Sequence, residues 1–180
     1  MLLLPAILAI YETQAEKDHA SALFEAHHKA MFFEARQVLN SHEDAEDAVQ
    51  EAFIIIHGHL NKLEDITCHK TRSFVVIVAK NIARNMIRKR KRATLVSLDE
   101  MPYELPSEGD EVFEGIEVEA ILSAIHDLPE LAREVLLMKY RHHCTDKELA
   151  DIMGIRYDTA HKRIERARAL LTRKLVKHEQ

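Results

Sequence analysis

Apolar residues recur at steps of three and four positions over much of the first 93 residues, which is the period of an amphipathic helix. These stripes predict helices over 23–39, 45–60 and about 71–92. The polar stretch "NSHEDAED" separates the first two, and its candidate N-caps for the second helix are Asn40, Ser41 and Asp44. We expect a helical N-terminal domain, on which the short apolar opening "MLLLPAILAI" packs as a further helix.

The pattern after residue 128 predicts three or four shorter helices in a helix-turn-helix arrangement. Thr145 and Glu148 have the spacing of a capping box, so a helix should begin there. Gly154 should end it, because glycine readily adopts the left-handed backbone of a tight turn. A basic helix follows from about Tyr157. The Ala-x-x-x-Gly-Ile spacing that begins at Ala150 completes the prediction.

The charges are segregated along the chain, although its formal net charge is only −5. Eight of the 25 Lys and Arg residues lie in 72–92, which contains no acid, and eight more lie in 156–177. Residues 94–119 hold nine acids and no base. Two of the four prolines and two of the four glycines lie in 94–116, which is typical of a linker. The chain therefore reads as two basic regions joined by an acidic connector.

Glycine and proline are scarce overall, at four residues each, and this composition favours an all-α fold. We expect two small helical domains joined by an acidic flexible linker, with boundaries 1–93, 94–116 and 117–180. The two cysteines show no disulfide or CxxC pattern, which fits a reducing cytoplasm. No apolar run reaches the length of a membrane span, so no membrane is expected as a partner.

Two basic helices carry the candidate chemistry. Arg84 to Arg92 include six cations with no acid at helical spacing to pair with, which points to a counter-ion outside the domain. One face of that helix suits melted or single-stranded nucleic acid, and its members are Asn81, Arg84, Asn85, Arg88 and Arg92. On the second helix of the helix-turn-helix, the residues placed to bind duplex DNA are Arg156, Thr159, Lys162, Arg163 and Arg166.

An enzyme or a metalloprotein has little support. The 12 histidines show no convincing ligand spacing, since neighbours such as His142, His143 and Cys144 point apart on a helix. A phosphate-binding glycine loop and a nucleophile elbow are both missing from the sequence. We therefore expect no catalytic residue, no metal and no cofactor.

The order of these parts resembles the bacterial RNA polymerase sigma factors of the extracytoplasmic-function group, within the sigma-70 family. "DAEDAVQEAFIII" (44–56) is similar to that family's polymerase-binding helix. "FVVIVAKNIARNMIRKRKR" (74–92) is similar to its promoter-melting helix. "LPELAREVLLMKY" and "KELADIMGIRYDTAHKRIERARALL" are similar to its C-terminal domain.

The resemblance implies a sigma factor that binds core RNA polymerase and directs promoter recognition, promoter melting and initiation. It implies a polymerase-binding set of Glu46, Asp47, Gln50 and Glu51. The face that begins at Asn81 would contact the −10 element, and the set that begins at Arg156 the −35 element. The loop at about 63–69 would take a flipped base. Promoter DNA and core polymerase are the expected partners, an anti-sigma protein is a third candidate, and the free protein should be a cytoplasmic monomer.

Two other functions stay open at this point. A dimeric helix-turn-helix repressor or activator would use 1–93 as a sensing domain, but it would leave the cations at 84–92 without a purpose. A palindromic binding site that needs no polymerase would favour it. A helical interaction or structural protein is the third reading, and it would contact neither nucleic acid nor polymerase.

Overall fold

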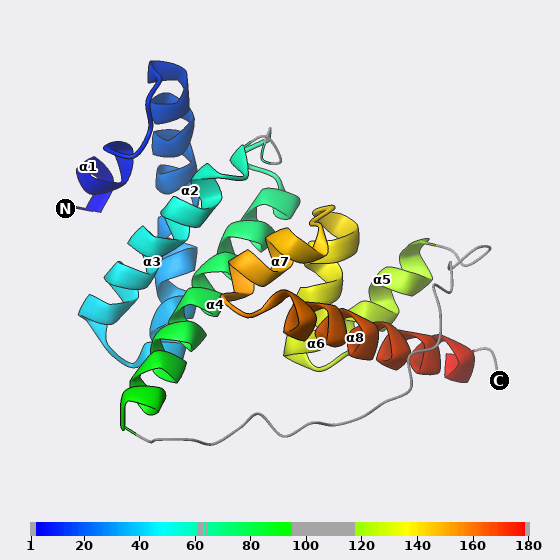
Figure 1. The fold of residues 1–180 in the computed structure, drawn as a ribbon. Coiled ribbons are helices and arrows are strands. Elements are labelled where there is room, and N and C mark those ends of the chain that lie inside the picture. Colours follow the sequence, from blue (N-terminus) through cyan, green and yellow to red (C-terminus); the bar gives the residue numbers. More distant parts are fainter. Residues whose placement is uncertain (1–2, 61–62, 64, 95–117, 179–180) are drawn as a thin grey trace. The chain divides into compact units, whose positions relative to one another are not determined.

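The computed structural model describes residues 3–60, 63, 65–94 and 118–178, and its secondary structure over these ranges is helical (Figure 1). The chain divides into two units, the first with α1–α4 and the second with α5, α6, η2, α8 and most of α7. The predicted all-α class is therefore confirmed. The predicted acidic linker lies outside the described residues apart from Thr94, so the domain limits at 93 and 117 stay a prediction.

The first unit is built on three long helices, which pack on one another in all three pairings. Its elements are α1 (Leu3–Leu8), α2 (Gln14–Leu39), α3 (His42–His57) and α4 (His69–Thr94). Each long helix buries one stripe, as the periodicity predicted. The largest fully buried side chains of this core are Leu23, Met31, Phe53, Ile56, Leu63 and Phe74. Burying one such side chain contributes about 1.5–3 kcal/mol.

The apolar opening forms the predicted helix and packs on the unit. Ile7 on α1 is buried, and so is Tyr11 just after it. The Tyr11 hydroxyl donates a hydrogen bond to the backbone carbonyl of Phe53 on α3, at 3.4 Å. Burial, with a smaller contribution from Glu16, raises the pKa of Tyr11 to about 12. This segment is thereby fixed to α3 as well as to α2.

A two-residue corner joins α2 to α3. Asn40 caps the end of α2 in the left-handed conformation, with φ of 56°, and its N–H donates to the carbonyl of Arg36. Ser41 is the N-cap of α3, because its side chain accepts from the N–H of Asp44 at 3.3 Å. Of the three candidate N-caps, the structure thus selects Ser41, and Asp44 is left for another contact.

The second unit consists of four shorter segments and one long helix. They are α5 (Val118–His126), α6 (Glu130–Leu136), the π-helical turn η2 (Leu137–Arg141), α7 (Asp146–Met153) and α8 (Tyr157–His178). The largest fully buried side chains here are Leu136, Met138, Leu149 and Ile164. The sequence pattern did not predict the π-helical turn. On α6, Leu131 is 39% exposed, whereas Val135 one turn later is buried.

The helix-turn-helix is formed by α7 and α8, as predicted. Thr145 and Glu148 make the capping box: the Glu148 carboxylate accepts from the Thr145 N–H at 2.7 Å, and the Thr145 hydroxyl accepts from the Glu148 N–H at 3.2 Å. Gly154 has φ of +57°, the left-handed turn that its position required. The N–H of Ile155 then donates to the carbonyl of Ala150 at 3.0 Å, which closes the end of α7.

Candidate nucleic-acid interface

The acidic face of α3 lies opposite its buried stripe. Asp47 is exposed, and Glu46, Gln50 and Glu51 are half-buried. Glu46 also contacts His42, one turn earlier, at 3.4 Å. The predicted polymerase-binding residues are therefore brought together on one side of one helix.

The sequence reasoning missed an apolar member of this face. Ile54 is 59% exposed, and it lies seven positions after Asp47, so both side chains point to the same side of α3. In the sequence, Ile54 is hidden in the run "FIII", in which Phe53 and Ile56 are core residues. An exposed apolar side chain among charged ones is typical of the centre of a protein interface.

The predicted −10 face of α4 is only partly accessible. Arg84, Asn85 and Arg88 are half-buried and lie within two turns of one another, and the Arg88 guanidinium donates to the Asn85 side-chain oxygen. Asn81 is only 3% exposed, and its amide donates to the carbonyl of Ile77 on the same helix at 2.9 Å. The side chain of Arg92 lies outside the described residues.

Two cations of the cluster at the end of α4 pair with acids on α3. Arg90 forms a two-bond ion pair with Asp44, with a distance of 2.7 Å from Nη1 to Oδ2. The Lys89 ammonium lies 4.0 Å from the Glu51 carboxylate. The hydrogen bonds from Arg90 are the main reason that the pKa of Asp44 lies below its usual range. The sequence argument considered acids on the same helix only, so it missed these partners.

The loop before α4 is tied to the two helices beside it. A ring nitrogen of His27 on α2 (Nε2) lies 2.6 Å from the carbonyl of Ile66, and the Thr71 hydroxyl on α4 donates to the carbonyl of Asp65 at 2.5 Å. Hydrogen bonds from Thr71 lower the pKa of the Cys68 thiol. His27 is buried, and its neighbour His28 is half-buried. This loop is the one expected to take a flipped base.

On α8 the predicted −35 residues line the start of the helix and the face that follows. Arg156 and Lys162 are exposed, while Thr159, Arg163 and Arg166 are half-buried. Tyr157, which the sequence reasoning did not select, is 54% exposed at the first position of the helix. Of the five predicted −35 residues, Arg156 and Lys162 are thus the exposed ones.

Asp146 connects three elements of the helix-turn-helix. Its carboxylate accepts from Lys139 on η2, and its other oxygen lies 3.0 Å from the His161 ring on α8. Burial alone would raise the pKa of Asp146, but the hydrogen bonds from His161 and Lys139 outweigh it, so this pKa lies below its usual range. Asp146, at the start of α7, thus links α7 to both η2 and α8.

Other cations of α8 are bound within their own unit. Arg168 donates to the Tyr140 hydroxyl at 2.7 Å and to the Glu165 carboxylate at 3.3 Å. Lys174 lies 3.1 Å from the Asp127 carboxylate, just after α5. The contacts with Tyr140 and Asp127 hold α8 to the rest of its unit.

Metal and membrane functions gain no support from the described part of the chain. Within it, no group of three or more His, Cys, Asp or Glu residues could hold a metal ion. The helices of the same ranges include none that is long and apolar enough to cross a membrane. Cys68 and Cys144 are both free thiols.

Comparison with known proteins identifies both units. Residues 23–93 match the Sigma-70 region 2 family, and residues 118–171 match the Sigma-70 region 4 family. RNA polymerase sigma factor SigZ of Bacillus subtilis is 29% identical over 133 residues, which cover 74% of this chain and 73% of that protein. A probable RNA polymerase sigma factor, RfaY of Xanthomonas campestris, is 27% identical over 141 residues, 73% of this chain. The match spans 34% of RfaY, about a third of its length.

One solved structure covers 84% of this chain and 92% of its own, at 20% identity and a TM-score of 0.33. It is the sigma factor RpoE of Bartonella quintana in complex with the anti-sigma factor NepR. Sigma factors are a non-enzymatic family, in agreement with the lack of a catalytic pattern in the sequence. With region 2 in its first unit and region 4 in its second, this chain belongs to the sigma-70 family of RNA polymerase sigma factors, in the extracytoplasmic-function group.

Proposed function

We propose that this chain binds core RNA polymerase and directs it to promoters, where it takes part in DNA melting and the start of transcription. The observation that carries the proposal is the presence of regions 2 and 4, in that order, in one chain. A dimeric regulator would not need the first of these regions. The basic helix in each unit supplies the cations that DNA binding requires.

In this proposal the exposed face of α3 binds the polymerase. Glu46, Asp47, Gln50 and Glu51 offer carboxylates and an amide to a basic surface, and Ile54 adds an apolar centre. Charge complementarity of this kind speeds association and fixes orientation. The apolar contact then supplies affinity that salt does not screen.

The −10 element is assigned to α4 and the loop before it. Arg84, Asn85 and Arg88 offer guanidiniums and an amide, which suit the open base edges and phosphates of melted DNA. Arg92 belongs to the same assignment through the sequence resemblance. The role of Asn81 is different. Its side-chain amide donates to the Ile77 carbonyl within the helix, so we assign it to supporting this face more than to contacting bases.

The −35 element is assigned to α8 in the major groove. Arg156 directly precedes the helix, and Thr159 and Lys162 lie in its first two turns, where recognition helices read bases. Arg163 and Arg166 follow on the same helix as contacts to the groove wall or backbone. Core polymerase and promoter DNA are the partners, and an anti-sigma protein is a candidate third. We expect a monomer in the cytoplasm when the chain is free.

Run-off transcription with purified core polymerase on a pool of promoters tests this function. We expect new transcripts whose start sites share two upstream motifs at a fixed spacing. Asp47→Lys should abolish them by repelling the basic polymerase surface, while Asp18→Lys on the exposed side of α2 should not. A chain that yields no start sites, but shifts palindromic DNA without polymerase, would be a dimeric regulator.

A further inference from the structure

Helix α1 comes before the part of the chain that matches Sigma-70 region 2. That match begins at residue 23, whereas α1 spans Leu3–Leu8, so the match gives α1 no function. The helix has the sequence LLPAIL, and neither it nor the two residues that follow carry a charged side chain. A helix that is apolar on every side is usually buried on every side. The apolar surface of α1 therefore needs a reason.

Packing within the first unit accounts for only one side of α1. Ile7 is 3% exposed, and the helix packs on α2 and α3. Pro5 and Ala9 lie four positions apart on the other side, and both are exposed. The N–H of Ala9 donates to the carbonyl of Pro5 at 3.2 Å, so the helical turn continues to Ala9. Adjoining exposed apolar residues, unlike isolated ones, mark a site of interaction.

Tyr11 holds this segment against the end of α3. Its hydroxyl donates to the Phe53 carbonyl at 3.4 Å, and its ring meets the His57 ring edge to face, with centroids 4.6 Å apart. His57 lies three positions after Ile54 and seven after Gln50, so these side chains are neighbours on the surface of α3. The N-terminal segment therefore borders the acidic face of α3, at the end that holds Ile54.

The two neighbouring surfaces have the same chemical character. Acids surround the exposed Ile54 on α3, and the exposed Glu12 follows the apolar surface of α1. An apolar centre with a polar rim is the usual composition of a protein interface. Stable interfaces use about 20–30 residues a side, many more than one face of α3 provides. The addition of α1 enlarges that face without changing its character.

We propose that α1 extends the acidic face of α3 into one surface that binds core RNA polymerase. Pro5 and Ala9 add apolar contacts beside Ile54, and Glu12 adds an acid at the rim. The polymerase surface that fits is apolar at its centre and basic around it. This inference rests on the proposed function and deepens it, because it adds a further segment of the chain to the contact with the same partner.

Two other occupants fit this surface less well. A second copy of the chain would bring the acids of two identical faces together, and like charges across an interface cost free energy. A bilayer with anionic lipids would repel the same acids. Core polymerase, with a basic surface, complements them.

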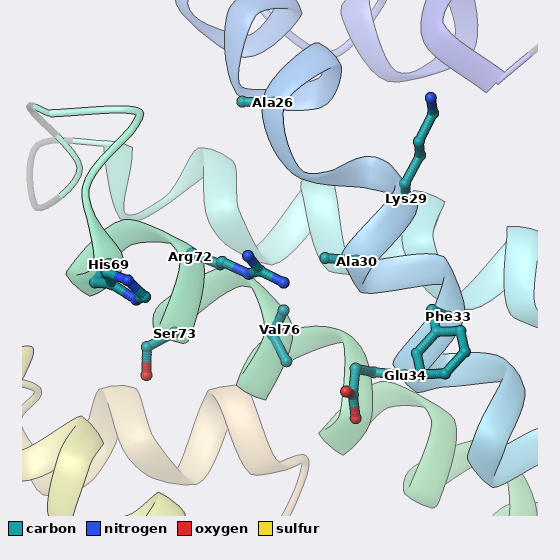
Figure 2. A pocket seen from close by; sticks show the side chains of 9 residues that line it. All are labelled: Ala26, Lys29, Ala30, Phe33, Glu34, His69, Arg72, Ser73 and Val76. Carbon is teal, nitrogen blue, oxygen red and sulfur yellow. The ribbon is translucent and has the colours of Figure 1, made fainter.

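The test measures the affinity of the fluorescently labelled full chain for purified core polymerase, without DNA, by anisotropy. We expect Ala9→Lys to weaken binding by about tenfold or more, because a cation would face an apolar and basic surface. The matched control is Ala26→Lys, which changes another exposed alanine in the same way. Ala26 lies on α2, in the groove between α2 and α4 (Figure 2), so Ala26→Lys should have no effect.

The sign of the added charge separates a contact from a structural role. Ala9→Glu should bind core polymerase more tightly than Ala9→Lys, and added salt should reduce the difference. Because Ala9 is exposed, both variants should melt like wild type in circular dichroism. Pro5→Lys and Pro5→Glu repeat the comparison at a second exposed position if an Ala9 variant unfolds.

Three results would overturn the proposal. The first is an equal loss of affinity for the Lys and Glu variants, and the second is no loss in either. The third is a change confined to self-association of the free chain in sedimentation velocity, or to binding of anionic lipid vesicles.

Failure of this surface and failure of the function look different. If the wild-type chain binds core polymerase and directs initiation, and the α1 variants match it, only the proposal for α1 is wrong. If the wild-type chain neither binds core polymerase nor directs initiation, the proposed function is wrong, and the proposal for α1 falls with it.

Discussion

The two basic helices, α4 and α8, use their cations differently. On α8 the ion-paired cations include Arg168 and Lys174, whose partners Glu165 and Asp127 belong to the second unit. On α4 the paired cations include Lys89 and Arg90, whose partners are acids of α3. Arg168 of α8 donates to the Tyr140 hydroxyl within its own unit, whereas Lys89 of α4 lies beside Glu51, an acid assigned to polymerase.

A run of basic residues in a sequence is therefore not by itself evidence of a DNA-binding surface. The cluster at 84–92 looked like six charges kept for DNA, but at least two of them have partners within the same unit. Because Glu51 also belongs to the predicted polymerase face, polymerase and α4 would compete for it. Substitutions on each helix can test whether α4 and α8 use their cations as differently as their contacts indicate.

The largest effect should come from Lys162, an exposed cation of α8. Lys162→Ala should lower transcription from promoters that depend on the −35 element by roughly tenfold or more, because a base contact contributes about 1–3 kcal/mol of discrimination. Lys174→Ala should leave transcription almost unchanged, since Lys174 is bound to Asp127. Quantitative run-off transcription measures both. Equal losses would mean that paired and unpaired cations of α8 do not differ.

The turn residues of the two units should respond in opposite directions. Gly154→Ala should destabilise the second unit by about 1–2 kcal/mol, because φ of +57° is unfavourable for a residue with a Cβ atom. Gly58→Ala should be neutral or stabilise the first unit by about 0.4–1 kcal/mol, since its φ is −68°. Urea unfolding followed by circular dichroism distinguishes them. A stabilising Gly154→Ala would contradict the left-handed turn.

Acid should weaken the second unit through Asp146. Its pKa is lower in the folded chain than in the unfolded one, so its stabilising contribution is complete above the usual pKa of aspartate, about 3.9. The contribution is lost as the pH falls below that value through the folded pKa. Asp146→Asn should therefore lower stability at neutral pH and flatten its decline toward pH 3. Urea midpoints across this pH range test the prediction, and parallel curves for both proteins would refute it.

The smallest effect on stability is expected for the ion pair between α3 and α4. Asp44→Asn should barely change the melting temperature, because exposed ion pairs are screened by solvent. It should instead remove one acid that competes with DNA for Arg90. We expect a steeper salt dependence of binding to nonspecific DNA, by up to about one unit in the slope of log K against log salt. An unchanged slope would show that the pair does not limit DNA binding.

The sequence was sufficient to predict the helices and the helix-turn-helix, because their signals are local. Buried stripes repeat every three to four residues, and the capping box of Thr145 and Glu148 lies within one turn. Gly154 marked the turn by itself. The assignment of cations could not be predicted in the same way. Arg90 and Asp44 are 46 positions apart, and only the packing of α3 on α4 brings them together.

The accessible apolar residues were also beyond sequence reasoning. Phe33 follows Phe32, and Ile54 lies in a run of three isoleucines, so periodicity with a tolerance of one residue could not say which side chain is exposed. The exposed fraction depends on where neighbouring helices end, which is a property of the packed unit. Both residues could be identified as exposed only after that packing was known.

The corner at Asn40 and Ser41 has a consequence for engineering. Only two residues separate α2 from α3, and both of them cap a helix. The connection therefore cannot accommodate an added residue. Inserting one alanine into the first turn of α3 would rotate everything after it by about 100° relative to the corner. The helix α3 could then no longer bury its apolar stripe and keep its acidic face exposed at the same time. The length of this junction sets the rotation of α3, so a change in the number of residues matters more there than a change in residue type.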